Sequence, residues 1–472
     1  MLQIKSCYRF NPALLITIVM LSLVGCDKPE TSTESAEPPR VPNPISVVFV
    51  EAGGVGDEIA RRWEAETGAK VNCTEVSLAD FADDDYAVLR KHDVVVSPTM
   101  LTGDLLENEL ITPLPGAVWS SEVLESRGLL RHCRTTLASF GQERFSIPVS
   151  NPHFMMLIRN ELVETWGRPL PTTWRGMMAL VDKATELENF EVNVSIPCAP
   201  GWAARSFIAI AAPEIRQRGN LNTLFNRRTM KPMLTTPPFV RGLERLKELA
   251  GENISLNPQT TVQQFQSGKS PIAIGWPSRS FEAQSTDESP IYDKTIVSRM
   301  PGTRQAYDVK TGKWKSLDVD SHTVEFTGFA ATQISILRSA SHPVDVYRFV
   351  EWLGSKRTTG SVLSVASFGS PTRAAHLGNI NNWAGDVFDQ RTLDQYSDLL
   401  SEAVESPIYL TFPRIPGSVQ YWGALEEAVQ SFLSGKTDAL PALQQAEMRW
   451  EEITESFGRK NQLNMLRRDE SL

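Results

Sequence analysis

The residues of this chain best suited to chemistry are aromatic and lie beside glycine and proline. Trp276 stands between a glycine and a proline at the end of the apolar run Ile272-Ala273-Ile274, and Trp202 follows a proline-glycine pair. Flat rings at such places stack on the apolar C–H faces of a sugar, while fixed polar groups nearby bind its hydroxyls. The pattern therefore marks both tryptophans as candidate ligand contacts, with packing in a hydrophobic core as the alternative for each.

Polar candidates follow two predicted strands. Glu51 and Gly53 come directly after the β-branched run Ile45–Val50, and Thr99 follows a second run, Val94-Val95-Val96. In open α/β sheets, ligands lie beyond the carboxyl ends of the strands. Glu51 can accept hydrogen bonds from hydroxyls there, and Gly53 permits a close approach of the backbone. A solvated loop acid is the alternative interpretation of Glu51.

No catalytic or cofactor-binding motif is present. The chain has no G-x-x-x-x-G-K-[S/T] loop, H-E-x-x-H helix or G-x-S-x-G elbow. Gly54-Val55-Gly56 follows a strand, but Ile59 occupies the place of the third glycine in a dinucleotide fingerprint. The six histidines show no metal-ligand spacing. We therefore expect a protein that is not an enzyme and uses no cofactor or metal. A glycosidase pair of carboxylates facing across a cleft would leave no such motif and is the least favoured alternative.

The N-terminus predicts export. Lys5 and Arg9 precede an apolar run, Ala13–Val24, that is too short to span a bilayer and suits a secretory signal. Leu23-Val24-Gly25-Cys26 resembles the bacterial lipobox, which implies lipidation of Cys26 and membrane anchoring by its acyl chains. We expect a signal peptide over 1–25, a hydrated tether over 26–44, and a periplasmic or cell-surface location.

The composition limits the class of protein and the kinds of partner that the rest of the chain can have. Apolar residues make up 41% and charged residues 22% of the sequence, as in ordinary globular proteins. The net charge of −9 becomes −11 once Lys5 and Arg9 leave with the signal, which disfavours nucleic acid as a partner. Cys73, Cys133 and Cys198 either form one disulfide or stay free thiols.

Strand and helix patterns alternate from residue 45. Apolar runs predict strands at 45–50, 71–76 and 94–96, each followed by a helix, which is the order of a mostly parallel sheet with helices outside it. A second lobe begins near residue 150. The polar region 285–325 predicts a loop or hairpin, and the last 80 residues predict helices.

This layout resembles the type II periplasmic solute-binding proteins, in the carbohydrate-binding branch that serves ABC importers. Five segments carry the likeness, in the order of the family: Val47–Val76, Asp93–Pro113, Ser146–Glu186, Phe265–Pro277 and Gly328–Ser355. The resemblance implies an α/β fold of two lobes, each a mostly parallel sheet flanked by helices, with the ligand cleft between them. It implies lobe I over 45–148, lobe II over 149–325, a return to lobe I over 326–400, and C-terminal helices over 401–472, mainly in lobe II.

The same resemblance implies further site residues. The family has a ligand-stacking aromatic residue at the start of a C-terminal helix, where this chain has Tyr421-Trp422, although Trp422 also shares a face with apolar residues. Asn151 and His153 follow an expected hinge crossing, and Phe329 is implied to line the cleft. Arg414 can bind hydroxyls or a carboxylate, with an ordinary surface arginine as the alternative.

The function that the resemblance implies is capture of a sugar or oligosaccharide by hinge closure, by a monomer that delivers it to ABC permease subunits. Two alternatives keep the fold: a different small solute, such as a polyamine or a metal ion, or delivery to a membrane sensor instead of a permease.

Overall fold

The computed structural model describes residues 41–470, except 52–53, 84–85, 188–189, 219–221, 277–293, 327–330, 364–368 and 385–387. The signal peptide and Cys26, and all of the tether before residue 41, lie outside the described residues. Gly53 and Phe329 also lie outside them. Among the described residues, none of the helices combines the length and the apolar character needed to cross a membrane.

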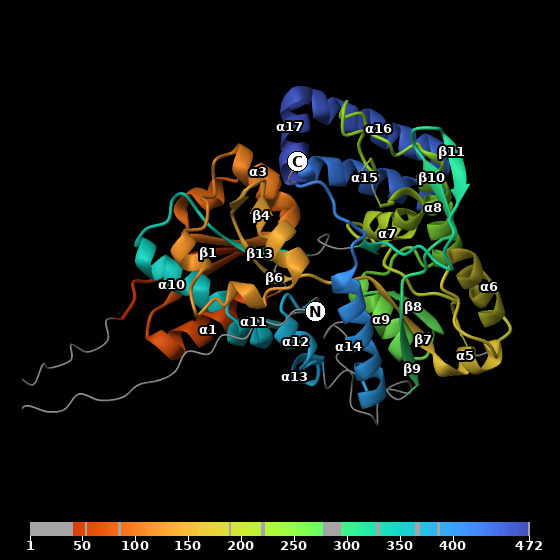
Figure 1. Cartoon of the computed structure of the whole chain (residues 1–472), viewed down its shortest axis with the longest axis horizontal. Helices are drawn as coiled ribbons and strands as arrows, with labels where there is room; N and C mark the ends of the chain where they lie inside the picture. The colour runs from red at the N-terminus through yellow and green to blue at the C-terminus, as the bar shows by residue number, and fades with distance from the viewer. Residues whose placement is uncertain are drawn as a thin grey trace, which may run out of the picture. The chain divides into compact units, whose positions relative to one another are not determined.

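The first lobe is built on a five-stranded sheet with the order β2-β1-β3-β13-β6 (Figure 1). The first three strands are parallel, as the alternating pattern predicts, and β13 runs antiparallel to β3 and β6. Its elements are β1 (Ile45–Val50), α1 (Gly56–Thr67), β2 (Val71–Val76), α2 (Leu78–Asp83), β3 (Val94–Pro98), α3 (Thr102–Glu107), α4 (Gly116–Trp119), β4 (Ser139–Phe140), β5 (Glu143–Arg144), β6 (Ile147–Ser150), β13 (Thr332–Ile336), α10 (Pro343–Leu353) and α11 (Lys356–Leu363).

The second lobe is built on a three-stranded sheet with the order β8-β7-β9. Strand β7 pairs antiparallel with both neighbours, so this sheet departs from the expectation of a mostly parallel one. Buried apolar runs look alike in parallel and antiparallel strands, and the sequence pattern therefore left the strand directions open. Its elements are β7 (Met155–Arg159), α5 (Asn160–Trp166), α6 (Trp174–Ala184), α7 (Ala203–Ile215), α8 (Pro237–Ala250), α9 (Pro258–Gln266), β8 (Ile272–Gly275), β9 (Thr295–Arg299), β10 (Gln305–Asp308) and β11 (Lys313–Ser316).

The chain passes between the lobes more than once. Strand β6 of the first sheet leads into β7 of the second through residues 151–154, and β12 (Glu325–Phe326) precedes β13 of the first sheet. Strand β12 pairs in parallel with β14 (Tyr409–Leu410), and the two form a separate short sheet. These segments form the hinge region.

The return to the first lobe is shorter than the sequence suggests. Strand β13 and helix α10 pack in the first core, but Leu377, Tyr396 and Leu400 belong to the core around β7, β8 and β9. The side chain of Thr392 also donates to the carbonyl of Thr295 in β9 at 2.9 Å. Leu377 belongs to α12 (Ala374–Leu377), and the other three belong to α14 (Gln390–Glu405); α13 (Asn381–Ala384) lies between these helices in sequence and adds Trp383 to the same core.

The C-terminal helices are as predicted from their periodicity. They are α15 (Ser418–Leu433), α16 (Ala439–Ser456) and α17 (Arg459–Asp469). Helix α15 packs against α16 and against α7 of the second lobe. The polar region before them contains the hairpin β10–β11, with a left-handed Gly312 at its turn (φ 66°), as the Thr-Gly pair predicts.

Cys73, Cys133 and Cys198 are free thiols. The structure therefore decides the choice left open by the sequence in favour of unpaired cysteines.

Candidate ligand-binding site

Two of the predicted tryptophans meet in the second lobe. The ring centroids of Trp202, just before α7, and Trp276, just after β8, are 5.4 Å apart in an edge-to-face arrangement. Phe154 lies 4.2 Å from Trp276, and Phe326 lies 5.7 Å from Phe154. Neither phenylalanine was singled out by the sequence. The only signal for Phe154 was its place directly after the hinge residue His153.

Trp422 joins this group through an arginine. The guanidinium carbon of Arg205 lies 4.7 Å from the ring centroid of Trp202 and 5.1 Å from that of Trp422. An arginine held over aromatic faces at such distances gains ~0.5–2 kcal/mol from cation–π attraction. We call Phe154, Trp202, Trp276 and Trp422 the aromatic wall, and Arg205 connects two of its members.

The members of the wall differ in how much of each side chain is exposed to solvent. Phe154 and Trp276 are each 3% exposed and Trp422 is 5% exposed, whereas Trp202 and Arg205 are only half-buried. Trp202 and Arg205 are therefore the two residues of this group that solvent can reach. Trp276 and Trp422 support them from the core, which combines the binding and packing interpretations of these residues.

Charged groups from both lobes surround Arg205. Glu426 on α15 accepts hydrogen bonds from the backbone N–H of Ala204 and from the side chain of Gln430, both at 2.9 Å. Burial lowers the pKa of Arg205 to about 10, while the charges of Glu426 and Glu51 act in the opposite direction. Arg205 thus stays charged at neutral pH, with one carboxylate of each lobe in its electrostatic surroundings.

Glu51 lies where the sequence predicts it, at the carboxyl end of β1. It is exposed, it has a left-handed backbone (φ 54°), and its Oε1 accepts a hydrogen bond from the backbone N–H of Leu78 at 2.9 Å. That bond holds the carboxylate in place while leaving its other oxygen for further contacts. Its negative charge also favours the charged form of Arg205.

Thr99 is buried, unlike a residue that is exposed to contact a ligand. It is 1% exposed, and its backbone N–H donates to the carbonyl of Ala331 at 2.9 Å. Its own carbonyl accepts from the hydroxyl of Thr102 at 2.7 Å. These bonds tie the end of β3 to the hinge region, and a ligand contact of Thr99 stays a prediction.

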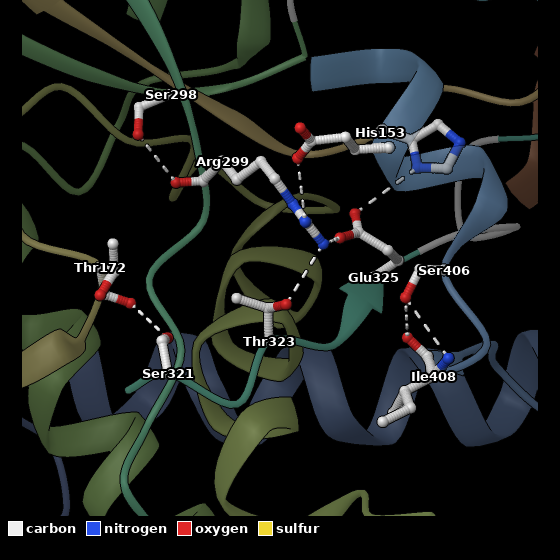
Figure 2. Close-up of polar contacts among 10 residues, drawn as sticks. His153, Thr172, Ser298, Arg299, Ser321, Thr323, Glu325, Ser406 and Ile408 are labelled. Carbon is white, nitrogen blue, oxygen red and sulfur yellow. Dashed lines mark hydrogen bonds and ion pairs between the residues drawn. The ribbon is translucent and has the colours of Figure 1, made fainter. Parts of the chain in front are cut away.

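Asn151 and His153 lie in the crossing between β6 and β7, as expected for hinge residues. They are 1% and 5% exposed, and their side-chain nitrogens are 3.4 Å apart. Figure 2 shows His153 facing Glu325, whose carboxylate lies 3.9 Å from the Nδ1 atom and also pairs with Arg299. Burial, aided by the charge of Arg299, lowers the pKa of His153 to about 4, so its ring is neutral at neutral pH.

These hinge residues line a small cavity of about 10 Å³, which has room for about one water molecule and not for a sugar. Its polar lining comes from both lobes and from the hinge: His132, Cys133, Asn151, His153, Glu325, Ser406 and Tyr409. The ring of His132 lies 4.3 Å from that of Tyr409, and burial lowers its pKa to about 3. The cavity is part of the hinge, and the aromatic wall is the better candidate for a sugar.

Tyr421 and Arg414 have structural contacts. Tyr421 is fully buried, its hydroxyl lies 2.8 Å from that of Thr454, and its ring packs at 5.4 Å from Trp450. Arg414 is 3% exposed and donates to the carboxylate of Asp469 at 2.7 Å, besides two backbone carbonyls. A ligand could reach these side chains only by displacing those partners, so their ligand roles remain predictions that this arrangement disfavours.

Within the described parts of 41–470, no group of three or more histidine, cysteine, aspartate and glutamate side chains is arranged to hold a metal ion.

No family model and no curated protein sequence matches this chain. Solved structures do match it in fold. A solute-binding protein of an ABC transporter from Agrobacterium radiobacter K84, in complex with ribitol, has a TM-score of 0.68 at 16% identity, over 87% of this chain and 98% of that one. MalE3 of T. maritima with bound maltose has a TM-score of 0.66 at 13% identity, over 87% and 100%.

A third match is the ABC substrate-binding protein Lmo0181 from Listeria monocytogenes in complex with cycloalternan. Its TM-score is 0.65 at 14% identity, and the match covers 88% of this chain and 99% of that chain. Nearly the whole length of each of these proteins is therefore reproduced in the present fold. The chain has the two-lobed, MalE-like fold of the type II periplasmic binding proteins, as its order of segments predicts.

Proposed function

We propose that this chain is the extracytoplasmic substrate-binding lipoprotein of an ABC importer, and that it binds a sugar or oligosaccharide between its lobes. One observation carries the proposal. In a fold whose solved members hold ribitol, maltose and cycloalternan, half-buried Trp202 and Arg205 lie together at 4.7 Å, and exposed Glu51 ends β1 of the other lobe. An aromatic face, a multiple donor and a carboxylate are the groups that a polyhydroxylated ligand needs.

In this mechanism the ligand is bound and released without any chemical change. A sugar ring stacks on Trp202, its oxygens accept hydrogen bonds from Arg205, and Glu51 accepts from its hydroxyls when the lobes close. A ligand favours the closed form only by as much as it binds that form more tightly. Contacts from Glu51, which are available to a ligand on the wall only on closure, supply this difference. Permease subunits then recognise the closed shape.

Anchoring is part of the same proposal. The lipobox at Cys26 and the tether over 26–44 would hold a monomeric binding domain at the membrane surface, after removal of residues 1–25. Replacing Cys26 with serine should move the protein from the membrane fraction to the soluble extracytoplasmic fraction. Retention of the variant in the membrane fraction, with the signal cleaved, would contradict lipid anchoring.

The binding proposal is tested by calorimetry of ligand-depleted protein with ribitol, mannitol, maltose and maltotriose. We expect at least one to bind, and Trp202→Ala to weaken that binding about tenfold or more, since stacked aromatic anchors each contribute ~1–2 kcal/mol. Trp166→Ala is the matched control, because Trp166 is also half-buried but lies on α5 and stacks with exposed Arg168. Equal losses in the two variants, or binding only of solutes that are not carbohydrates, would overturn the proposal.

A further inference from the structure

Arg205 is the charged residue at the centre of the aromatic wall. It lies in the first turn of α7, and its side chain donates to the carbonyl of Gly201. Helices α7 and α15 lie side by side (Figure 1). The guanidinium carbon lies 4.7 Å from the ring centroid of Trp202, just before α7, and 5.1 Å from that of Trp422 on α15.

Two carboxylates complete its surroundings. Glu426 is 9% exposed and is fixed by the hydrogen bond from Ala204, while Glu51 is exposed on the other lobe. Aromatic faces together with carboxylates are the groups with which proteins hold a cationic ligand. Here the guanidinium of the chain itself already occupies that place.

We propose that Arg205 is the specificity-determining residue of the cleft, which fills its cation site and so restricts the ligand to neutral polyols and sugars. This inference rests on the function proposed above, because it concerns which members of one ligand class that site accepts. A neutral sugar can stack on Trp202 and accept hydrogen bonds from the guanidinium. An amine at the same place would meet a like charge at short range.

The same arrangement disfavours acidic ligands. The carboxylate of Glu426, fixed by the backbone N–H of Ala204, opposes the approach of a sugar acid to Arg205. A local positive charge would normally attract anions. In this cleft Glu426 offsets part of that attraction, while the guanidinium still repels a cation placed directly against it.

The experiment measures affinities of full-length mature protein for four probes: maltose, ribitol, spermidine and glucuronate. Wild type should bind the better neutral probe at least tenfold more tightly than spermidine or glucuronate. Arg205→Ala should weaken the neutral probe about tenfold and strengthen spermidine about tenfold, because two indoles then border an empty cation site with the Glu426 carboxylate nearby. Methylguanidine at millimolar concentration should restore neutral-sugar binding to this variant.

Matched variants separate this role from a structural one. Arg205→Lys keeps the charge, and we expect it to keep the exclusion of spermidine. Arg168→Gln removes an exposed arginine that stacks on Trp166 at 3.7 Å outside the wall, and it should behave as wild type. Arg205→Met keeps an apolar side chain against the indoles, so it can replace Arg205→Ala in the same experiment if that variant does not fold.

The outcomes are distinguishable. If a neutral sugar binds wild type but Arg205→Ala leaves the ratio of neutral to cationic affinities unchanged, the inference is wrong and the proposed function stands. If wild type binds spermidine or glucuronate as tightly as the neutral sugar, the proposed exclusion of charged ligands is also refuted. If no neutral sugar binds wild type at all, the proposed function itself fails.

Discussion

Replacing Glu325 with glutamine should weaken the hinge, while the same change at Glu402 should not. Glu325 lies in β12, is 7% exposed, and faces His153 and Arg299 (Figure 2). The side chain of Glu402 is 63% exposed and lies 3.5 Å from the same guanidinium. The two variants therefore compare a buried and an exposed partner of one arginine.

The magnitude follows from burial. Removing one partner of a fully buried pair costs about 3–5 kcal/mol. The side chain of Arg299 is 25% exposed and keeps a hydrogen bond of 3.2 Å to Thr323, so solvent screens part of the loss. We expect Glu325→Gln to lower the free energy of unfolding by about 1–3 kcal/mol. Glu402→Gln should cost less than about 0.5 kcal/mol.

Urea unfolding, followed by tryptophan fluorescence and circular dichroism, measures both losses. The dependence of the free energy on urea should be unchanged, so that a shift of the midpoint reports stability alone. Equal losses for the two variants, or a loss below about 0.5 kcal/mol for Glu325→Gln, would refute the reasoning that burial sets the strength of this pair.

Further predictions concern helix packing and a buried aspartate. Gly242→Ala should cost about 1–3 kcal/mol in urea unfolding, because its new Cβ would lie 2.7 Å from that of Ala211 on the facing helix. Gly423→Ala, on a helix with open space around it, should instead add about 0.5–1 kcal/mol; equal effects would contradict this. Burial raises the pKa of Asp104 to about 6 from 3.8, although its carboxylate accepts from the hydroxyl of Ser418. The free energy of unfolding of wild type, relative to Asp104→Asn, should therefore rise by about 3 kcal/mol from pH 7 to below 4, and a flat difference would contradict it.

The parts of the fold that could be predicted are those in which local pattern and tertiary role agree. The β-branched run Ile45–Val50 becomes β1, in the middle of the first sheet, and the helical periodicity after Pro343 becomes α10. Strand direction in the second lobe and the lobe to which α14 belongs depend on long-range pairing. No local pattern encodes these, and the expectations that the family resemblance implied for both differ from what the structure shows.

The candidate site divides in the same way. Trp202 and Trp276 were found because glycine and proline neighbours set them apart, and the structure brings them together. Arg205 was missed, since an arginine in the first turn of a helix ordinarily points to solvent. Its role arises from Trp422, more than two hundred residues away, and from Glu51 in the other lobe.

The distribution of these groups between the lobes bears on the order of binding. Among the described residues, the aromatic wall and Arg205 come from the hinge and the second lobe, whereas Glu51 is a first-lobe group. A ligand can therefore gain its stacking contacts on the second lobe before the lobes close. Since closure is favoured only by contacts that the open form lacks, the interaction with Glu51 supplies closing energy and the wall supplies initial affinity. Initial affinity and closing energy thus come from different residues of one site. A substitution in the aromatic wall should change the first, and a substitution of Glu51 should change the second.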